Sequence, residues 1–280
     1  ETGRFLALAA GIAEALGRIH RAGLIHKDVK PANILVDCSD GRVRFTGFAM
    51  ASSLQIAGQP AEPPEMIAGT LAFMAPEQTG RTNRPVDARS DLYALGVTLY
   101  LMATGTMPFA ASDPMELVHL HIARRPDAPR DREGSVHPVI SAMIMKLLEK
   151  APEDRYQTAA GLLHDLHRCL DAWTTEQQIP TFALGARDVP DRLLIPDRLY
   201  GRERESATIR DCLERVANGG VAELVLVSGY SGVGKSTLVN DLQKAMGSSG
   251  GLFASGKFDQ HQRDVPYATL VQALEALVRY

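Results

Sequence analysis

Hydrophobic positions in the first 173 residues recur mostly at the spacing of α-helices. In the stretch 4–22, apolar side chains lie three or four residues apart along the sequence, as they do on one face of an amphipathic helix. Two short strands are predicted on either side of a turn, at Ile34–Asp37 and Arg42–Thr46. We therefore expect this part of the chain to be mainly α-helical. Further helices are predicted at residues 92–102, 114–123, 136–150 and 158–173.

The pattern changes after residue 173. Residues 174–199 show no sustained periodicity and are interrupted by prolines, which is typical of a linker. The stretch Tyr200–Glu203 is then predicted to open a helix that runs to about Ala217. The continuous apolar run Glu223–Ser228 follows it, and such runs are typical of buried parallel β-strands. Residues 200–280 are therefore predicted to be the first part of a second domain, of the α/β class.

Composition limits the kinds of partner and compartment. The 280 residues include 30 basic and 33 acidic side chains, so the net charge of −3 does not suggest a nucleic-acid partner. Three cysteines far apart in the sequence argue against a disulfide framework and favour a reducing compartment. No apolar run reaches the ~18 residues of a membrane helix. We therefore expect a cytoplasmic protein. Because the sequence starts and stops within helical patterns, we also expect it to be a fragment of a longer chain.

The stretch His26–Asn33 carries the most specific polar pattern of the first domain. Its residues fit the spacing H-x-D-x-K-x-x-N. Phosphoryl transfer uses groups of these types. The Asp28 carboxylate would accept the proton of the attacking hydroxyl, the Lys30 cation would offset the charge of the moving phosphate, and the Asn33 amide oxygen would ligate magnesium. A polar turn before a strand would account for the same residues without any chemistry.

Later motifs decide between these two interpretations. Together with the stretch 26–33, their order resembles the C-terminal lobe of serine/threonine protein kinases, which implies this mainly α-helical fold for residues 1–173. The resemblance also implies an N-terminal lobe upstream, because the glycine-rich loop and the ATP-anchoring lysine of that lobe are not in the sequence. The motifs that carry the resemblance are Gly69-Thr70, Ala75-Pro76-Glu77, Ser90-Asp91 and Pro152–Tyr156.

The kinase resemblance assigns roles to further residues. It implies that Thr70 bonds to the catalytic aspartate and lysine, and that Asp91 holds the backbone of the catalytic loop. It also implies that Glu77 and Arg155 form a buried ion pair. His26 is expected to be a packed structural imidazole.

One departure from the kinase pattern concerns the metal site. Where kinases have Asp-Phe-Gly, with an aspartate that holds magnesium, this chain has Gly47-Phe48-Ala49. Losing that carboxylate removes charge stabilisation from the transition state. Two hypotheses therefore stay open. The lobe belongs either to an ATP-dependent serine/threonine kinase with one magnesium held by Asn33, or to a pseudokinase that binds a partner or nucleotide.

The second domain contains a candidate nucleotide site. Residues 229–237 fit G-x-x-x-x-G-K-[ST] directly after the apolar run, and the predicted helix 238–246 follows them. In such a loop, backbone N–H groups surround phosphate oxygens, the lysine neutralises the outer phosphates, and the next hydroxyl ligates magnesium. A glycine-rich turn that binds nothing is the alternative. The predicted nucleotide-binding residues are Gly229, Ser231, Gly232, Val233, Gly234, Lys235, Ser236 and Thr237, with Ser236 as the magnesium ligand.

The order of the two domains resembles that of a family of multi-domain proteins. A kinase-like lobe, a proline-bearing linker, Tyr200–Glu203 and a P-loop follow one another, with the local strings Glu77–Arg81 and Gly256–Gln260. This arrangement is similar to large bacterial sensors that combine a serine/threonine-kinase-like domain, an AAA-type ATPase, a GAF domain and a histidine kinase. The resemblance implies ATP and magnesium as cofactors and a role in two-component signal transduction, with a protein partner that the sequence does not identify.

Overall fold

The computed structural model describes residues 1–53, 71–82, 84–189 and 201–230, together with Lys235, Leu238, Val239 and seven residues beyond position 250. The chain divides into two compact units, Glu1–Leu194 and Ile195–Tyr280, and each is described by itself. The division falls inside the stretch 174–199 that was expected to be a linker.

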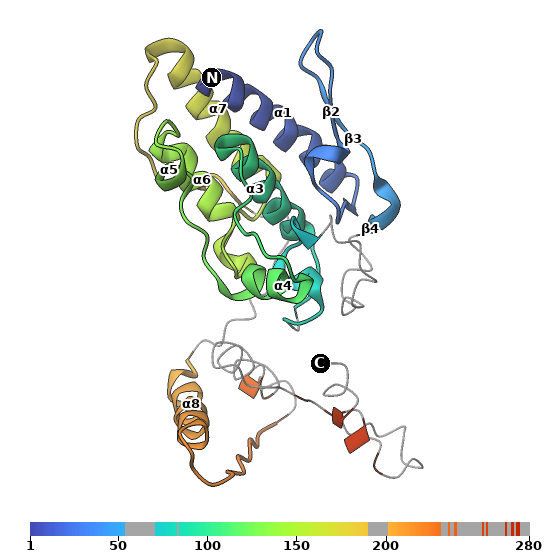
Figure 1. Cartoon of the computed structure of the whole chain (residues 1–280), viewed down its shortest axis with the longest axis vertical. Coiled ribbons are helices and arrows are strands. Elements are labelled where there is room, and N and C mark those ends of the chain that lie inside the picture. Colours follow the sequence, from blue (N-terminus) through green and yellow to red (C-terminus); the bar gives the residue numbers. More distant parts are fainter. Residues whose placement is uncertain are drawn as a thin grey trace. The chain divides into compact units, whose positions relative to one another are not determined.

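The first unit is built from helices, as predicted from the sequence (Figure 1). The long helices α1 (Thr2–Arg21) and α7 (Ala159–Glu176) lie side by side. Helix α3 (Ala88–Thr104) packs against α1 and against α6 (Pro138–Leu147). Every residue of α3 from Ser90 to Tyr100 is buried, as expected for a helix that is apolar on all sides. Two shorter helices lie among the described residues of this unit, α4 (Pro114–Ala123) and α5 (Pro129–Arg132).

Short strands and 3₁₀ turns connect these helices. Strand β2 (Ile34–Val36) pairs antiparallel with β3 (Val43–Phe45), slightly inside the predicted bounds. A second pair, β1 (Leu24–Ile25) with β4 (Ser52–Ser53), was not predicted, because two-residue strands are too short to show an alternating pattern. The 3₁₀ turns are η1 (Pro31–Asn33), η2 (Phe48–Met50), η3 (Pro76–Thr79) and η4 (Pro152–Asp154).

The second unit contains the predicted helix α8 (Glu203–Ala217), but the strand predicted over Glu223–Ser228 is wrong. Residues 220–230 have no regular secondary structure, and the side chains of Leu224 and Leu226 are 97% and 88% exposed. A strand is stabilised by hydrogen bonds to neighbouring strands, and the described part of this unit contains no other strand for the run to pair with.

Several predicted elements of this unit fall mostly outside the described residues. Leu238 and Val239 are helical, as are four of the residues described after position 267. The other residues of the predicted helix 238–246 and most of the predicted strand 252–258 are among those that the structure does not describe. Over the described residues, no helix is both long enough and apolar enough to span a bilayer.

Candidate functional site

The stretch His26–Asn33 leaves β1 through a strained residue. Lys27 has a φ of 63°, a left-handed conformation that costs a non-glycine residue roughly 1–2 kcal/mol. Its peptide groups are held from two sides. The Asp91 Oδ1 atom accepts from the Lys27 N–H at 2.7 Å, and Gln78 Nε2 donates to the Lys27 carbonyl at 2.9 Å. These contacts stabilise the turn that brings Asp28 into the site.

Asp91 is the anchor of this loop. The residue is 1% exposed, and its Oδ2 atom accepts from the His26 N–H at 2.8 Å and lies 2.9 Å from His20 Nε2. The contact between Asp91 and the loop backbone that the kinase resemblance implied is therefore present. His20 and Gln78 were not singled out from the sequence. Each reaches the loop or its anchor Asp91 through a contact between residues far apart in the sequence, which leaves no local pattern.

The structure brings together the three side chains predicted for catalysis. Asp28 Oδ2 lies 2.8 Å from Lys30 Nζ. Asn33 Nδ2 donates to the same Oδ2 atom and to the Asp28 carbonyl, both at 2.8 Å. Asp28 Oδ1 is buried and has no hydrogen-bond partner among the described residues. One oxygen of the candidate base is therefore saturated and the other is still able to accept a proton.

His26 lies behind this cluster. Its ring contacts the rings of Phe45 and Phe48, at centroid distances of 5.3 and 4.8 Å. The Asp28 N–H donates to His26 Nδ1 at 3.3 Å, and His26 Nε2 lies 2.9 Å from the Thr46 carbonyl. With Nδ1 accepting, Nε2 is assigned as the donor. Both ring nitrogens have a hydrogen-bond partner, and the ring packs against two aromatic side chains. This environment fits the structural role expected for His26.

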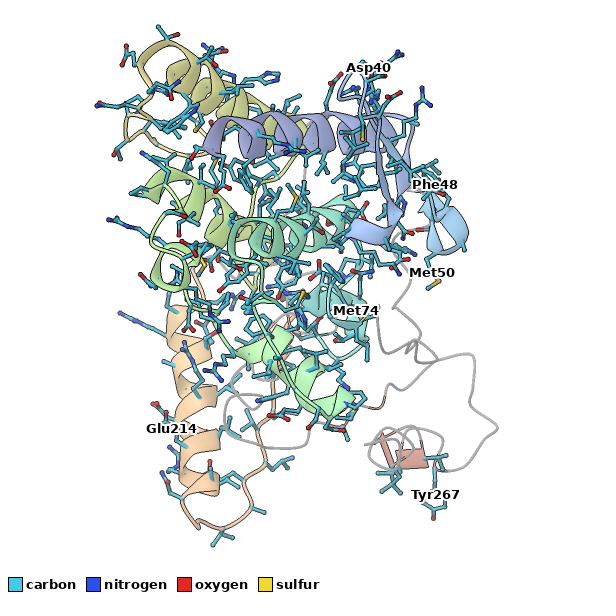
Figure 2. All side chains as sticks on the ribbon, turned by 45° about the horizontal axis from the view of Figure 1, so that its top comes forward. Asp40, Phe48, Met50, Met74, Glu214 and Tyr267 are labelled. Carbon is cyan, nitrogen blue, oxygen red and sulfur yellow. The ribbon has the colours of Figure 1, made fainter. Side chains whose placement is uncertain are left out.

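Gly47 occupies the position of the missing carboxylate. Its φ is 79°, and a Cβ atom built on it would lie only 2.5 Å from Asn33 Oδ1. Phe48 and Met50, labelled in Figure 2, follow Gly47 at the edge of the lobe and are 44% and 55% exposed. Kinase magnesium sites require a carboxylate at this position, and here the Asn33 amide fills its place. The residues present therefore do not fit such a metal site.

The ion pair expected between Glu77 and Arg155 is present and buried. Arg155 Nη1 and Nη2 donate to the two oxygens of Glu77 at 2.7 and 2.9 Å, and the side chains are 0% and 1% exposed. Ser90 Oγ adds a third donor at 2.7 Å. Burial raises the pKa of Glu77, but the charge and hydrogen bonds of Arg155 outweigh it, so the pKa lies below its ordinary value.

Arg155 also lies against the ring of Tyr93, and the hydroxyl of that tyrosine meets the buried His121. The Tyr93 hydroxyl is 2.9 Å from His121 Nδ1, and Lys150 Nζ donates to the His121 carbonyl at 2.8 Å. Burial, together with the charge of Lys150, lowers the pKa of His121 to about 3. The folded lobe therefore keeps this imidazole neutral at pH values where an unfolded chain protonates it.

This difference makes lobe stability dependent on pH. The stabilisation is complete above the unfolded pKa of 6.5 and is lost as the pH falls towards 3. Lowering the pH from 7.5 to 5.5 is expected to reduce the free energy of unfolding by about 1.4 kcal/mol more in the unchanged chain than in His121→Gln. Urea titrations at both pH values measure this difference. His119→Gln, on the exposed side of the same helix, should keep the full pH effect, and an equal loss in both variants would contradict the assignment.

Only part of the nucleotide loop is described. Lys235 Nζ donates to the carbonyls of Gly229 and Tyr230, both at 2.8 Å, so the lysine lies against the backbone of its own loop. Six of the predicted nucleotide-binding residues lie outside the described residues: Ser231, Gly232, Val233, Gly234, Ser236 and Thr237. Thr70, in the first unit, also lies outside them.

Comparisons with known proteins match two different domain families along the chain. Residues 3–166 match the protein kinase domain, and residues 198–280 match an AAA ATPase domain. The chain is 40% identical over 229 residues to hybrid signal transduction histidine kinase G of Dictyostelium discoideum, covering 75% of this chain and 7% of that protein. It is 38% identical over 166 residues to serine/threonine-protein kinase PknB of Mycolicibacterium smegmatis, covering 59% of this chain and 26% of that protein.

The chain thus spans about a quarter or less of the length of these relatives. Its kinase match covers more than half of its own residues, and an AAA ATPase domain follows that match. The chain belongs to the protein kinase family.

Proposed function

We propose that the chain is the regulatory and ATP-hydrolysing part of a signal-transduction protein. In this proposal the kinase-like lobe is a pseudokinase, and the P-loop domain is the nucleotide-driven switch. The observation that carries the proposal is the contact at Gly47, where Asn33 fills the space in which a metal-binding carboxylate would begin. Without that carboxylate, the charge that develops on the transferred phosphate is poorly stabilised.

The P-loop domain supplies the ATP chemistry in this proposal. Lys235 would neutralise the outer phosphates, and the Ser236 hydroxyl would hold magnesium. The position of this lysine directly after Gly234 in the G-x-x-x-x-G-K-[ST] spacing supports the first of these roles. Magnesium held there would offset the negative charge of the phosphates. The histidine kinase among the relatives favours signal relay as the purpose of the switch.

A second candidate is an active serine/threonine kinase. It is favoured by the assembled Asp28–Lys30–Asn33 cluster, in which Asp28 Oδ1 has no hydrogen-bond partner among the described residues and is able to accept a hydroxyl proton. The similarity to a serine/threonine-protein kinase points the same way. In this case Asp28 is the base, and Lys30 offsets the charge of the transferred group.

Labelling with γ-labelled ATP and magnesium separates the two candidates. The full-length protein is compared with Asp28→Asn and Lys235→Ala variants, and acid-stable phosphoserine and phosphothreonine are measured apart from acid-labile phosphohistidine. We expect no acid-stable label in any form. We also expect ATP hydrolysis to fall on the order of a hundredfold in Lys235→Ala and to remain unchanged in Asp28→Asn. Acid-stable label that disappears only in Asp28→Asn would overturn the pseudokinase proposal and establish the second candidate.

A further inference from the structure

The segment after α7 packs on the lobe. We call residues 177–188 the strap. Ile179 is 6% exposed and belongs to the main hydrophobic core, while Phe182 and Leu184 pack against that core. The Arg168 guanidinium lies 4.2 Å from the centre of the Phe182 ring, a cation–π distance. The strap is therefore part of the folded lobe, although its sequence has the composition of a linker.

The strap is also held by polar contacts at its far end. Asp188 Oδ1 accepts from the Thr158 N–H at 2.9 Å and from its hydroxyl at 2.7 Å, and Asp188 Oδ2 accepts from the Gln157 N–H. Three donors thus converge on one carboxylate. The Gly185 N–H donates to buried Asp165 at 2.7 Å, which fixes the strap three residues earlier.

Gly161 makes this close approach possible. A Cβ atom built on Gly161 would lie 2.2 Å from Asp188 Oδ1 and 2.5 Å from the Asp188 Cβ atom. Any larger residue at position 161 would push the strap off the start of α7. Gly161 lies in α7 and not on the strap, so the lobe itself leaves the room that the Asp188 side chain occupies.

The turn that Asp188 holds is the one that carries Arg155. The Gln157 side chain donates to the Pro152, Glu153 and Arg155 carbonyls at 3.0, 3.2 and 2.8 Å. Gln157 Oε1 accepts from Arg89 at 3.0 Å. The strap therefore holds the turn that carries Arg155. Arg155 in turn binds Glu77, which lies in η3.

We propose that the strap is coupled to the Glu77–Arg155 ion pair through Asp188 and the turn at residues 152–158. Loss of the Asp188 contacts is therefore expected to loosen the turn at residues 152–158 first, and then η3, which carries Glu77. The coupling does not depend on whether the lobe transfers phosphate, because it concerns the positions of Arg155 and Glu77 and not the reaction.

Hydrogen–deuterium exchange on the full chain tests this coupling. Asp188→Ala removes the carboxylate, and Gly161→Ala displaces it while leaving the strap sequence unchanged. In both variants, peptides covering 152–158 and 76–79 should exchange about tenfold faster or more, since several hydrogen bonds to a charged group are lost. Peptides from α1 should be unchanged, which excludes global unfolding. Asp171→Ala, at an exposed position on α7, is the matched control and should have no effect.

Two results would overturn the proposal. In the first, exchange rises only within residues 177–188, which would make the strap a passive tail. In the second, Asp171→Ala gives the same increase as Asp188→Ala, which would make the effect a general property of α7.

Discussion

Replacing Arg155 by methionine is expected to lower the free energy of unfolding of the kinase-like lobe by about 3–5 kcal/mol. The substitution leaves the Glu77 carboxylate buried with Ser90 as its remaining side-chain donor. It also removes the donor to three backbone carbonyls, those of Glu149, Arg89 and Lys150. An unpaired buried charge is among the costliest single changes that a folded protein can undergo.

Urea unfolding followed by tryptophan fluorescence measures this loss. The chain has one tryptophan, Trp173, which lies in α7 and packs against the core of the lobe. Arg125→Ala is the control, because Arg125 is 74% exposed and lies 3.5 Å from Glu149. Exposed pairs contribute at most about 1 kcal/mol. A similar loss in both variants would show that the burial of the Glu77 pair has no energetic consequence.

The same pair predicts the direction of acid sensitivity. Because the folded lobe holds the pKa of Glu77 below its ordinary value of 4.5, the stabilisation is present above that value. It is lost as the pH falls through the lowered pKa. Acid should therefore destabilise the unchanged lobe more than the Glu77→Gln variant, which has no carboxylate to protonate at this position.

Helices of the first unit were predictable because each one repeats a local rule. The apolar residues of α1 recur every three or four positions, and the sequence bounds of α4 agree with the structure. The run at Glu223–Ser228 fails for the opposite reason. A strand takes its stability from partners elsewhere in the chain, and an apolar run by itself does not specify them.

The candidate site shows the same limit. The spacing of Asp28, Lys30 and Asn33 was visible in the sequence, and the structure brings the three side chains together. The contacts that hold this cluster in place were not visible. Gln78 reaches the Lys27 carbonyl across 51 positions of sequence. Such long-range contacts are set by the packing of α3 and η3 and leave no local signal.

Position 47 has one feature that the sequence shows and one that only the structure shows. The sequence shows directly that a glycine stands where kinases have the aspartate of their metal site. It does not show that the Asn33 amide takes the vacated space, within 2.5 Å of the missing Cβ. The amide donates to Asp28 at the same time. Where the carboxylate is missing, the Asn33 amide thus lies against Gly47 and is hydrogen-bonded to Asp28.

Restoring the carboxylate should create acid-stable phosphorylation in the full-length protein. In Gly47→Asp, the φ of 79° is one that aspartate tolerates better than most residues. The atoms that the new Cβ would meet belong to the end of the Asn33 side chain and not to the backbone, so a shift of that amide would relieve the contact and release Asp28 Oδ2. The new carboxylate would supply the metal ligand that the site lacks, and we expect labelling to rise on the order of a hundredfold above background.

Two control variants make this result specific. Gly47→Asn has the same shape without the charge and should stay at background. Adding Asp28→Asn to Gly47→Asp should abolish the new label, because the restored metal ligand still requires a base within the cluster. If Gly47→Asp binds nucleotide but transfers no phosphate, the missing carboxylate is not what keeps the lobe inactive, and the contact between Gly47 and Asn33 loses its place in the functional argument. If the label appears in Gly47→Asp and depends on Asp28, a single side chain separates a regulatory lobe from a working kinase.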